Sequence, residues 1–141
     1  MSGITTVVAE RTFWDKVIIL HGARCWFEKR GVLRQEGQRV SRHYYDVHRM
    51  MHSAVAARAL SDLELAGDCV RHARLFFGSP DLGLELARPG GFALIPTAGM
   101  LDNLRRDYDR MQGRIVGDAP KFADVMNSIQ DLESQINGTQ P

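Results

Sequence analysis

Apolar residues recur at helical spacing along most of this chain, and this periodicity constrains the fold more than any other feature. The two clearest stripes follow offsets of 0, 3, 7, 10 and 14 near the C-terminus. They comprise Leu101, Leu104, Tyr108, Met111 and Ile115, and then Phe122, Val125, Ile129, Leu132 and Ile136. Each stripe predicts one buried helix face. The break at 117–120 predicts an antiparallel hairpin, and Asn137-Gly138 predicts its end.

Three more helices are predicted upstream. The first begins near Thr12, where Thr12 and Asp15 fit a capping box, and ends at Gly31. The second begins at about Ser41, and the third follows Ser61 as its N-cap. Their stripes are Tyr44, Val47, Met51 and Val55, and then Leu63, Ala66, Val70, Ala73 and Phe77.

Two segments are not predicted to be helical. Residues 78–97 hold four glycines and three prolines and predict an irregular connection, with 92–95 as a short extended piece on the core. The β-branched run 4–8 predicts a strand. A single strand cannot satisfy its own backbone groups, so it would pair with a second chain or with a sheet outside this chain. The alternative is a disordered tail.

The predicted fold is therefore all-α. We expect one domain over residues 1–141, with a strand or tail at 1–9 and helices over 10–141. About five helices would form a bundle that ends in the antiparallel hairpin and follows the orphan strand. The composition, 44% hydrophobic and 25% charged, is typical of a globular domain.

The chain shows no sign of export or membrane insertion. It holds no apolar run of about 20 residues, and Met1-Ser2-Gly3-Ile4 lacks the start of a signal peptide. The two cysteines, Cys25 and Cys69, are expected to be reduced thiols. These features predict a cytoplasmic protein without a membrane partner.

Charge is unevenly distributed. Residues 1–60 hold ten Lys/Arg and five Asp/Glu, whereas residues 61–141 hold eight and twelve. A basic half can face nucleic acid or a nucleotide. A solvated basic face is the alternative.

Two segments concentrate aromatic and ionisable residues: Thr12-Phe13-Trp14-Asp15-Lys16 and Ser41-Arg42-His43-Tyr44-Tyr45-Asp46. With Lys16 and Asp46 near two helix N-termini, the pair could form a phosphate site. Arg42 could pair with Asp46 or reach a phosphate, and Asp46 could hold Mg²⁺, although no metal site is assigned. The alternative is an ordinary salt bridge between helices.

Other candidates have structural alternatives too. Tyr44 and Tyr45 could stack on a base, or divide between core and rim. His48 and His52 have metal-ligand spacing without an evident third ligand. Asp102, Arg105, Arg106, Asp107 and Asp109 predict a solvated charged face.

These segments, in this order, resemble the later half of the AbiEii/AbiGii-type nucleotidyltransferase toxins, found in bacterial abortive-infection toxin–antitoxin systems. The resemblance covers nearly the whole chain. It continues through Leu75-Phe76-Phe77, Pro96, Asp107-Tyr108-Asp109-Arg110-Met111, Leu132-Glu133 and Ile136-Asn137.

The resemblance implies nucleotidyl transfer from a nucleoside triphosphate with Mg²⁺, onto tRNA in some members. Lys16 would contact the triphosphate, and Asp46 would act in catalysis or positioning. In the family, a front half carries a Gly-Ser motif and a metal-binding Asp-x-Asp pair. We find no such core in this chain, so we expect it to be inactive alone and to bind neither Mg²⁺ nor nucleotide without the missing half.

The implied partners are that nucleotidyltransferase domain or subunit, an antitoxin, tRNA, and a second copy of the chain. The chain would be a truncated reading frame, the second subunit of a split enzyme, or a retired toxin with a binding role. Two other functions stay open: a stand-alone helical module that binds RNA or protein, and a structural bundle that dimerises.

Overall fold

The computed structural model describes residues 2–33, 40–76, 82–112 and 120–138, and the described residues contain helices and no β-strand. The elements, in order, are α1 (Ser2–Arg30), α2 (Ser41–Met51), α3 (Ala54–Leu60), α4 (Leu63–Phe76), the short 3₁₀ helix η2 (Leu84–Leu86), α5 (Ala98–Gln112) and α6 (Phe122–Asn137). The predicted all-α bundle is confirmed.

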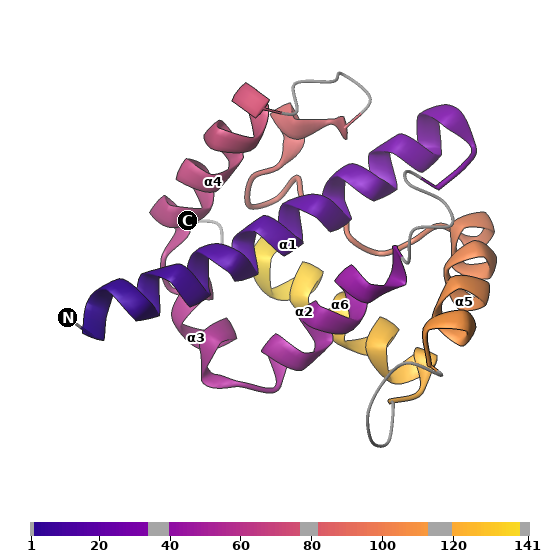
Figure 1. The fold of residues 1–141 in the computed structure, drawn as a ribbon. Helices are drawn as coiled ribbons and strands as arrows, with labels where there is room; N and C mark the ends of the chain where they lie inside the picture. Colours follow the sequence, from indigo (N-terminus) through magenta and orange to yellow (C-terminus); the bar gives the residue numbers. More distant parts are fainter. Residues whose placement is uncertain (1, 34–39, 77–81, 113–119, 139–141) are drawn as a thin grey trace.

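Helix α1 is the longest element and crosses the whole molecule (Figure 1). It packs against α2, α3 and α4, and α2 packs in turn against α3, α5 and α6. Buried apolar side chains from all six helices form one core. The seam between α1 and α2 therefore lies where most of the fold meets.

The predicted strand at residues 4–8 is wrong. This segment is the first part of α1, which continues without interruption to Arg30 and ends at Gly31, with φ of +71°. β-Branched residues cost a helix only a few tenths of a kcal/mol each. A helix also satisfies its own backbone groups, which an unpaired strand cannot do. The predicted capping box at Thr12 and Asp15 is wrong for the same reason, because both lie inside α1.

The aromatic pair Phe13-Trp14 anchors α1 in the core. Both side chains are fully buried, and their rings meet edge to face at 5.6 Å between centroids. The indole N–H of Trp14 donates a hydrogen bond to the Ala59 carbonyl of α3 at 3.0 Å. A buried indole needs such a partner, so this contact also fixes α3 against α1.

The second predicted helix is two helices in the structure. Helix α2 ends at Met51, and the Ser53 hydroxyl accepts the Val55 N–H at 3.3 Å, which caps α3. The next predicted cap is also shifted, since Asp62 rather than Ser61 accepts a backbone N–H in the first turn of α4, from Leu65 at 3.1 Å. Serine and aspartate side chains compete with helix continuation in this way.

The predicted stripe of α6 is confirmed, and that of α5 is confirmed in part, since Leu101 is only partly buried. All five predicted positions of α6 are buried, as are Leu104 and Tyr108 of α5. The rings of Tyr108 and Phe122 lie 5.7 Å apart, and the Tyr108 hydroxyl donates to the Pro120 carbonyl at 2.5 Å. These contacts join the adjoining ends of α5 and α6. Both helices otherwise pack against α2 and not along each other, so the predicted antiparallel hairpin is not seen among the described residues. The side chains of Met111 and Ile115, and residues 117–119, fall outside the described residues.

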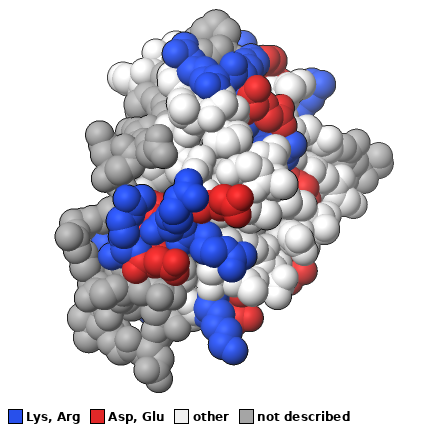
Figure 2. All heavy atoms as spheres, turned by 90° about the vertical axis from the view of Figure 1, so that its right-hand side faces the viewer, with Lys and Arg blue, Asp and Glu red and all other residues white. Residues whose placement is uncertain are grey.

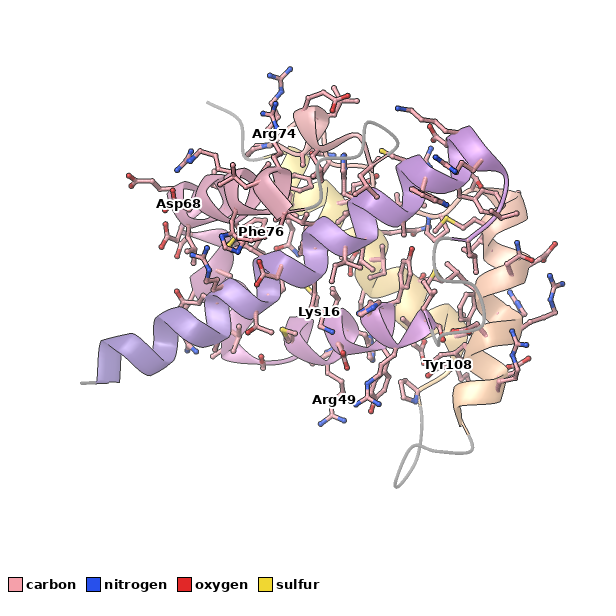
Figure 3. The ribbon with its side chains drawn as sticks, turned by 45° about the horizontal axis from the view of Figure 1, so that its top comes forward. Lys16, Arg49, Asp68, Arg74, Phe76 and Tyr108 are labelled. Carbon is pink, nitrogen blue, oxygen red and sulfur yellow. The ribbon has the colours of Figure 1, made fainter. Side chains whose placement is uncertain are left out.

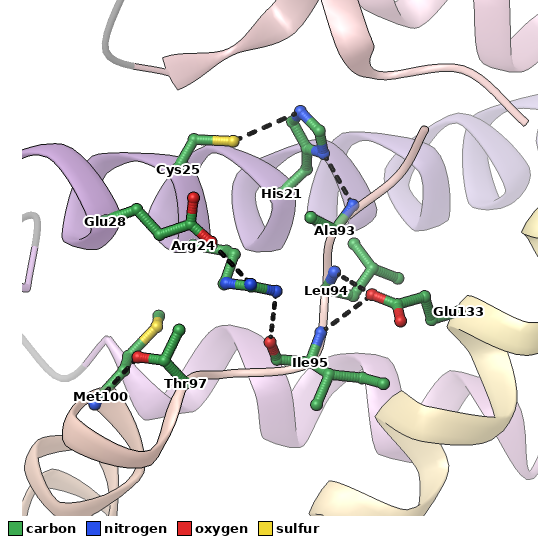
Figure 4. A network of polar contacts seen from close by, with 10 residues as sticks. All are labelled: His21, Arg24, Cys25, Glu28, Ala93, Leu94, Ile95, Thr97, Met100 and Glu133. Carbon is green, nitrogen blue, oxygen red and sulfur yellow. Dashed lines mark hydrogen bonds and ion pairs between the residues drawn. The ribbon is translucent and has the colours of Figure 1, made fainter. Parts of the chain in front are cut away.

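The extended piece before α5 is held by side chains of α1 and α6 (Figure 4). Glu133 accepts the N–H groups of Leu94 and Ile95 at 2.5 and 3.1 Å, and Arg24 donates to the Ile95 carbonyl at 2.9 Å. Leu94 is fully buried. The polar groups of this irregular backbone are thus satisfied without a sheet, as its predicted packing on the core requires.

His21 is a buried member of the same network. Its Nδ1 accepts the Ala93 N–H at 3.0 Å, so its Nε2 carries the proton that is donated to the Gly83 carbonyl at 2.7 Å. The neutral ring thus makes a hydrogen bond with each of its two nitrogens. Burial is the main cause that lowers the pKa of His21 below its usual range.

Acidification is therefore expected to destabilise the fold. The unfolded chain binds a proton at His21 more readily than the folded chain, so this stabilisation is complete above pH 6.5 and is lost as the pH falls towards the lowered folded pKa. Thermal unfolding between pH 7.5 and 5.5 should show a falling Tm. The control is His72→Asn, which changes an exposed histidine outside this network. A Tm that rises on acidification would contradict this account.

Tyr44 and Tyr108 make a matched pair of buried phenols. Among the described residues the Tyr44 hydroxyl has no hydrogen-bond partner, whereas Tyr108 has Pro120. We expect Tyr44→Phe to leave stability unchanged or to raise it by about 1 kcal/mol, because an unsatisfied buried hydroxyl is costly. Tyr108→Phe should cost about 1 kcal/mol. Chemical denaturation of both variants measures this difference, and equal losses would refute it.

Candidate functional site

The structure brings Lys16 and Asp46 together in the seam between α1 and α2. Lys16 Nζ lies 3.1 Å from Asp46 Oδ2, and the two side chains are 23% and 25% exposed. Figure 3 shows Lys16 between the two helices, on a side where Arg49 projects into solvent. The pair is reachable from outside the molecule. An ion pair this exposed contributes at most about 1 kcal/mol to stability.

His43 completes this cluster and was not among the predicted site residues. Its Nδ1 lies 3.1 Å from Lys16 Nζ. His43 and Asp46 are one turn apart on α2, so both face α1. The sequence signal for His43 is its spacing in the hexapeptide, since residues three apart share a helix face and His43 therefore lies beside Asp46. That spacing does not tell which residue of α1 the two side chains contact.

The predicted placement of this site at two free helix N-termini is wrong. Lys16 lies in the middle of α1, because that helix begins at Ser2. The N-terminus of α2 is already bound: Asp107 Oδ2 accepts the Ser41 backbone N–H at 2.7 Å and the Ser41 hydroxyl at 2.6 Å. A carboxylate of the chain therefore occupies the position expected for a phosphate.

Arg42 is exposed, and Asp46 forms its ion pair with Lys16 of α1. The two tyrosines of the hexapeptide separate as the structural alternative predicted. Tyr44 is buried, whereas Tyr45 is partly exposed and accepts a hydrogen bond from Arg49 at 2.9 Å. The outward face of α2 therefore carries two arginines beside Asp46.

Gly78-Ser79 and Asp107-Tyr108-Asp109 contain the letters of the family's core motifs, but the two aspartates do not form a metal-binding pair. Asp107 and Asp109 lie two apart on α5, where successive side chains point in different directions. Asp107 is buried against Ser41, whereas Asp109 is exposed. Two carboxylates so placed cannot share a metal ion. Residues 78–79 lie outside the described residues.

The predicted charged face of α5 is confirmed except at Asp107. Its other members, Asp102, Arg105, Arg106 and Asp109, are exposed. Figure 2 shows that Lys and Arg side chains are interspersed with Asp and Glu on this side of the molecule. The mixed charge does not favour a phosphate backbone as a ligand for this face.

His48 and His52 lie against α6 beside a polar hollow of about 420 Å³. His48 Nδ1 is within 2.7 Å of the Ser128 hydroxyl, and the two imidazole rings are 4.6 Å apart. In the described part of the chain, no three His, Cys, Asp or Glu side chains lie close enough to hold a metal ion.

The fold and the site together define an α-helical domain with a lysine held by an imidazole and a carboxylate in a partly exposed seam. The model of one protein family, described as the nucleotidyl transferase AbiEii toxin of type IV toxin–antitoxin systems, matches residues 2–131. The chain belongs to this family. The match confirms the resemblance, and the family's description implies an antitoxin partner.

No curated protein and no solved structure matches the chain. Among the described residues, no helix combines the length and the apolar character needed to cross a membrane.

Proposed function

We propose that this chain supplies Lys16 and Asp46 to a nucleotidyltransferase site whose Gly-Ser and Asp-x-Asp core lies elsewhere. The observation that supports this function is the contact of Lys16 with Asp46 across two helices that the family match covers. In the reaction, a hydroxyl of the acceptor attacks the α-phosphate of a nucleoside triphosphate. The new P–O bond replaces the bond to pyrophosphate, which leaves, and the hydroxyl proton passes to a base.

Each residue has a role that its chemistry allows. The Lys16 ammonium neutralises negative charge on the triphosphate, and the exposed Arg42 adds a second cation from the first turn of α2. Asp46 positions Lys16 and accepts a hydrogen bond from it. Phosphoryl-group transfer depends mainly on positioning and charge neutralisation, so these two tasks suffice for a helical domain.

We propose that Mg²⁺ is held by the core and not by this chain. Asp46 is already paired with Lys16, and the described residues offer no set of three metal ligands. A divalent ion in this reaction would need carboxylates from the core. We therefore propose that these 141 residues do not transfer nucleotides by themselves. tRNA as the acceptor, and the cytoplasm as the location, belong to the same proposal.

The coding DNA next to this chain tests the proposal. A Gly-Ser and Asp-x-Asp segment, in frame before Met1 or in an adjacent gene, is the expected result. If the neighbouring sequence holds no such segment, the catalytic role of Lys16 and Asp46 has no core to join and the proposal fails.

A protein-binding module is a second candidate, favoured by one observation. Leu75 and Phe76 at the end of α4 are 82% and 67% exposed, and two adjacent apolar side chains are unusual on a solvated helix. In Figure 3, Phe76 lies on the α4 side of α1 and Lys16 on the α2 side. Such binding would not need Lys16, so a Lys16 variant separates the two functions.

A further inference from the structure

Lys16 lies between two side chains of α2 and contacts both. The distance from Nζ is 3.1 Å to His43 Nδ1 and 3.1 Å to Asp46 Oδ2. The role proposed above for Lys16 accounts for the carboxylate. It does not account for the imidazole.

The chemistry of the contact fixes the state of the ring. An ammonium group has three donors and no acceptor, so the Nδ1 atom of His43 accepts. The lone pair is then on Nδ1, and the ring proton is on Nε2. A doubly protonated imidazolium cannot make this contact, so the observed geometry requires a neutral His43.

The surroundings of His43 favour that neutral ring. Its pKa is lowered by burial, and next by the positive charge of Lys16. Asp46 opposes this effect, and Arg42 on the same helix adds to it. Among the described residues, these three are the charged groups that act on the ring, one from α1 and two from α2 itself.

A lysine side chain without partners samples many rotamers, and binding an anion would have to order it. The two α2 contacts occupy two of the three ammonium donors and leave one for a ligand. We propose that His43 is a positioning residue, which accepts a hydrogen bond from Lys16 and thereby holds its ammonium group ready for a triphosphate. This inference rests on the proposed function and extends it to a third residue.

The inference can be tested on the full chain with inorganic tripolyphosphate as the probe. This anion has no base or sugar for the core to recognise, and it is added at a concentration high enough for the cations of this chain to bind it by charge alone. Nitrogen NMR of lysine- and histidine-labelled protein follows the Lys16 ammonium and the two ring nitrogens of His43. Three variants are compared with the wild type. His43→Phe keeps a ring without an acceptor, His43→Asn keeps an acceptor near the Nδ1 position, and His72→Asn changes an exposed histidine of α4.

We expect the Nδ1 atom of wild-type His43 to be unprotonated at neutral pH, and tripolyphosphate to shift the Lys16 signal. His43→Phe should bind the probe about tenfold more weakly, as the loss of one hydrogen bond to a charged group would predict. His43→Asn should restore most of the affinity, and His72→Asn should match the wild type. Thermal unfolding shows whether each variant is folded.

Three results would overturn the inference: a protonated Nδ1, wild-type affinity in a folded His43→Phe variant, or a wild-type Lys16 signal that does not respond to tripolyphosphate. None of these involves the catalytic core. A failure of the proposed function appears instead as a lack of nucleotide transfer when the core is present. The two failures are therefore distinguishable.

Discussion

Replacing Lys16 with alanine is expected to reduce nucleotide transfer by about 100-fold or more, in an enzyme assembled from this chain and a Gly-Ser/Asp-x-Asp core. In the proposed role, the Lys16 ammonium group neutralises negative charge on the triphosphate. Removing one preorganised hydrogen-bond donor from an active site typically lowers the rate by this factor. The fold should survive, because the Lys16–Asp46 pair is partly exposed and contributes at most about 1 kcal/mol. Label transfer from a nucleoside triphosphate to the acceptor measures the loss.

Lys121 provides the matched control, since it is an exposed lysine that precedes α6. Lys121→Ala should retain wild-type activity. Wild-type activity in a folded Lys16→Ala enzyme would leave the pair as an ordinary salt bridge between helices. That was the structural alternative predicted from the sequence.

Replacing Asp107 with alanine is expected to destabilise the domain by about 2–3 kcal/mol. The carboxylate is buried and accepts both the backbone N–H and the hydroxyl of Ser41, so its loss removes two hydrogen bonds at the start of α2. Helix α2 also carries His43 and Asp46, so the variant should weaken the site indirectly. Urea denaturation gives the change in the free energy of unfolding.

Asp109 is the control for Asp107, being two residues further along α5 and exposed. Asp109→Ala should change stability by less than about 0.5 kcal/mol. The two variants remove the same charge from the same motif. Equal effects would show that the Ser41 contact does not stabilise α2.

Periodicity was sufficient to predict most of the helices. The α6 stripe is buried at every predicted position. As expected, Gly31 directly follows the end of α1, and Gly138 directly follows the end of α6. Local propensity was a poorer guide. The β-branched run 4–8 predicted a strand, but its cost in a helix is small, and no partner strand is present among the described residues.

The candidate site was predicted in part. The order and composition of the two segments identified Lys16 and Asp46, which the fold brings into contact. Spacing alone gave no register between α1 and α2, so it could not show that His43 faces the same lysine. It also could not show that Asp107 caps α2, because that contact joins residues 66 positions apart. Long-range polar contacts of this kind depend on tertiary packing.

We propose that this chain completes a nucleotidyltransferase site formed mainly by another domain. The most direct measurement is label transfer from a nucleoside triphosphate, labelled on the α-phosphate, to tRNA by the chain, by the core and by both together. The account predicts transfer only by the combination, and none when Lys16→Ala replaces the wild-type chain. Equal transfer by the core with and without this chain would contradict it.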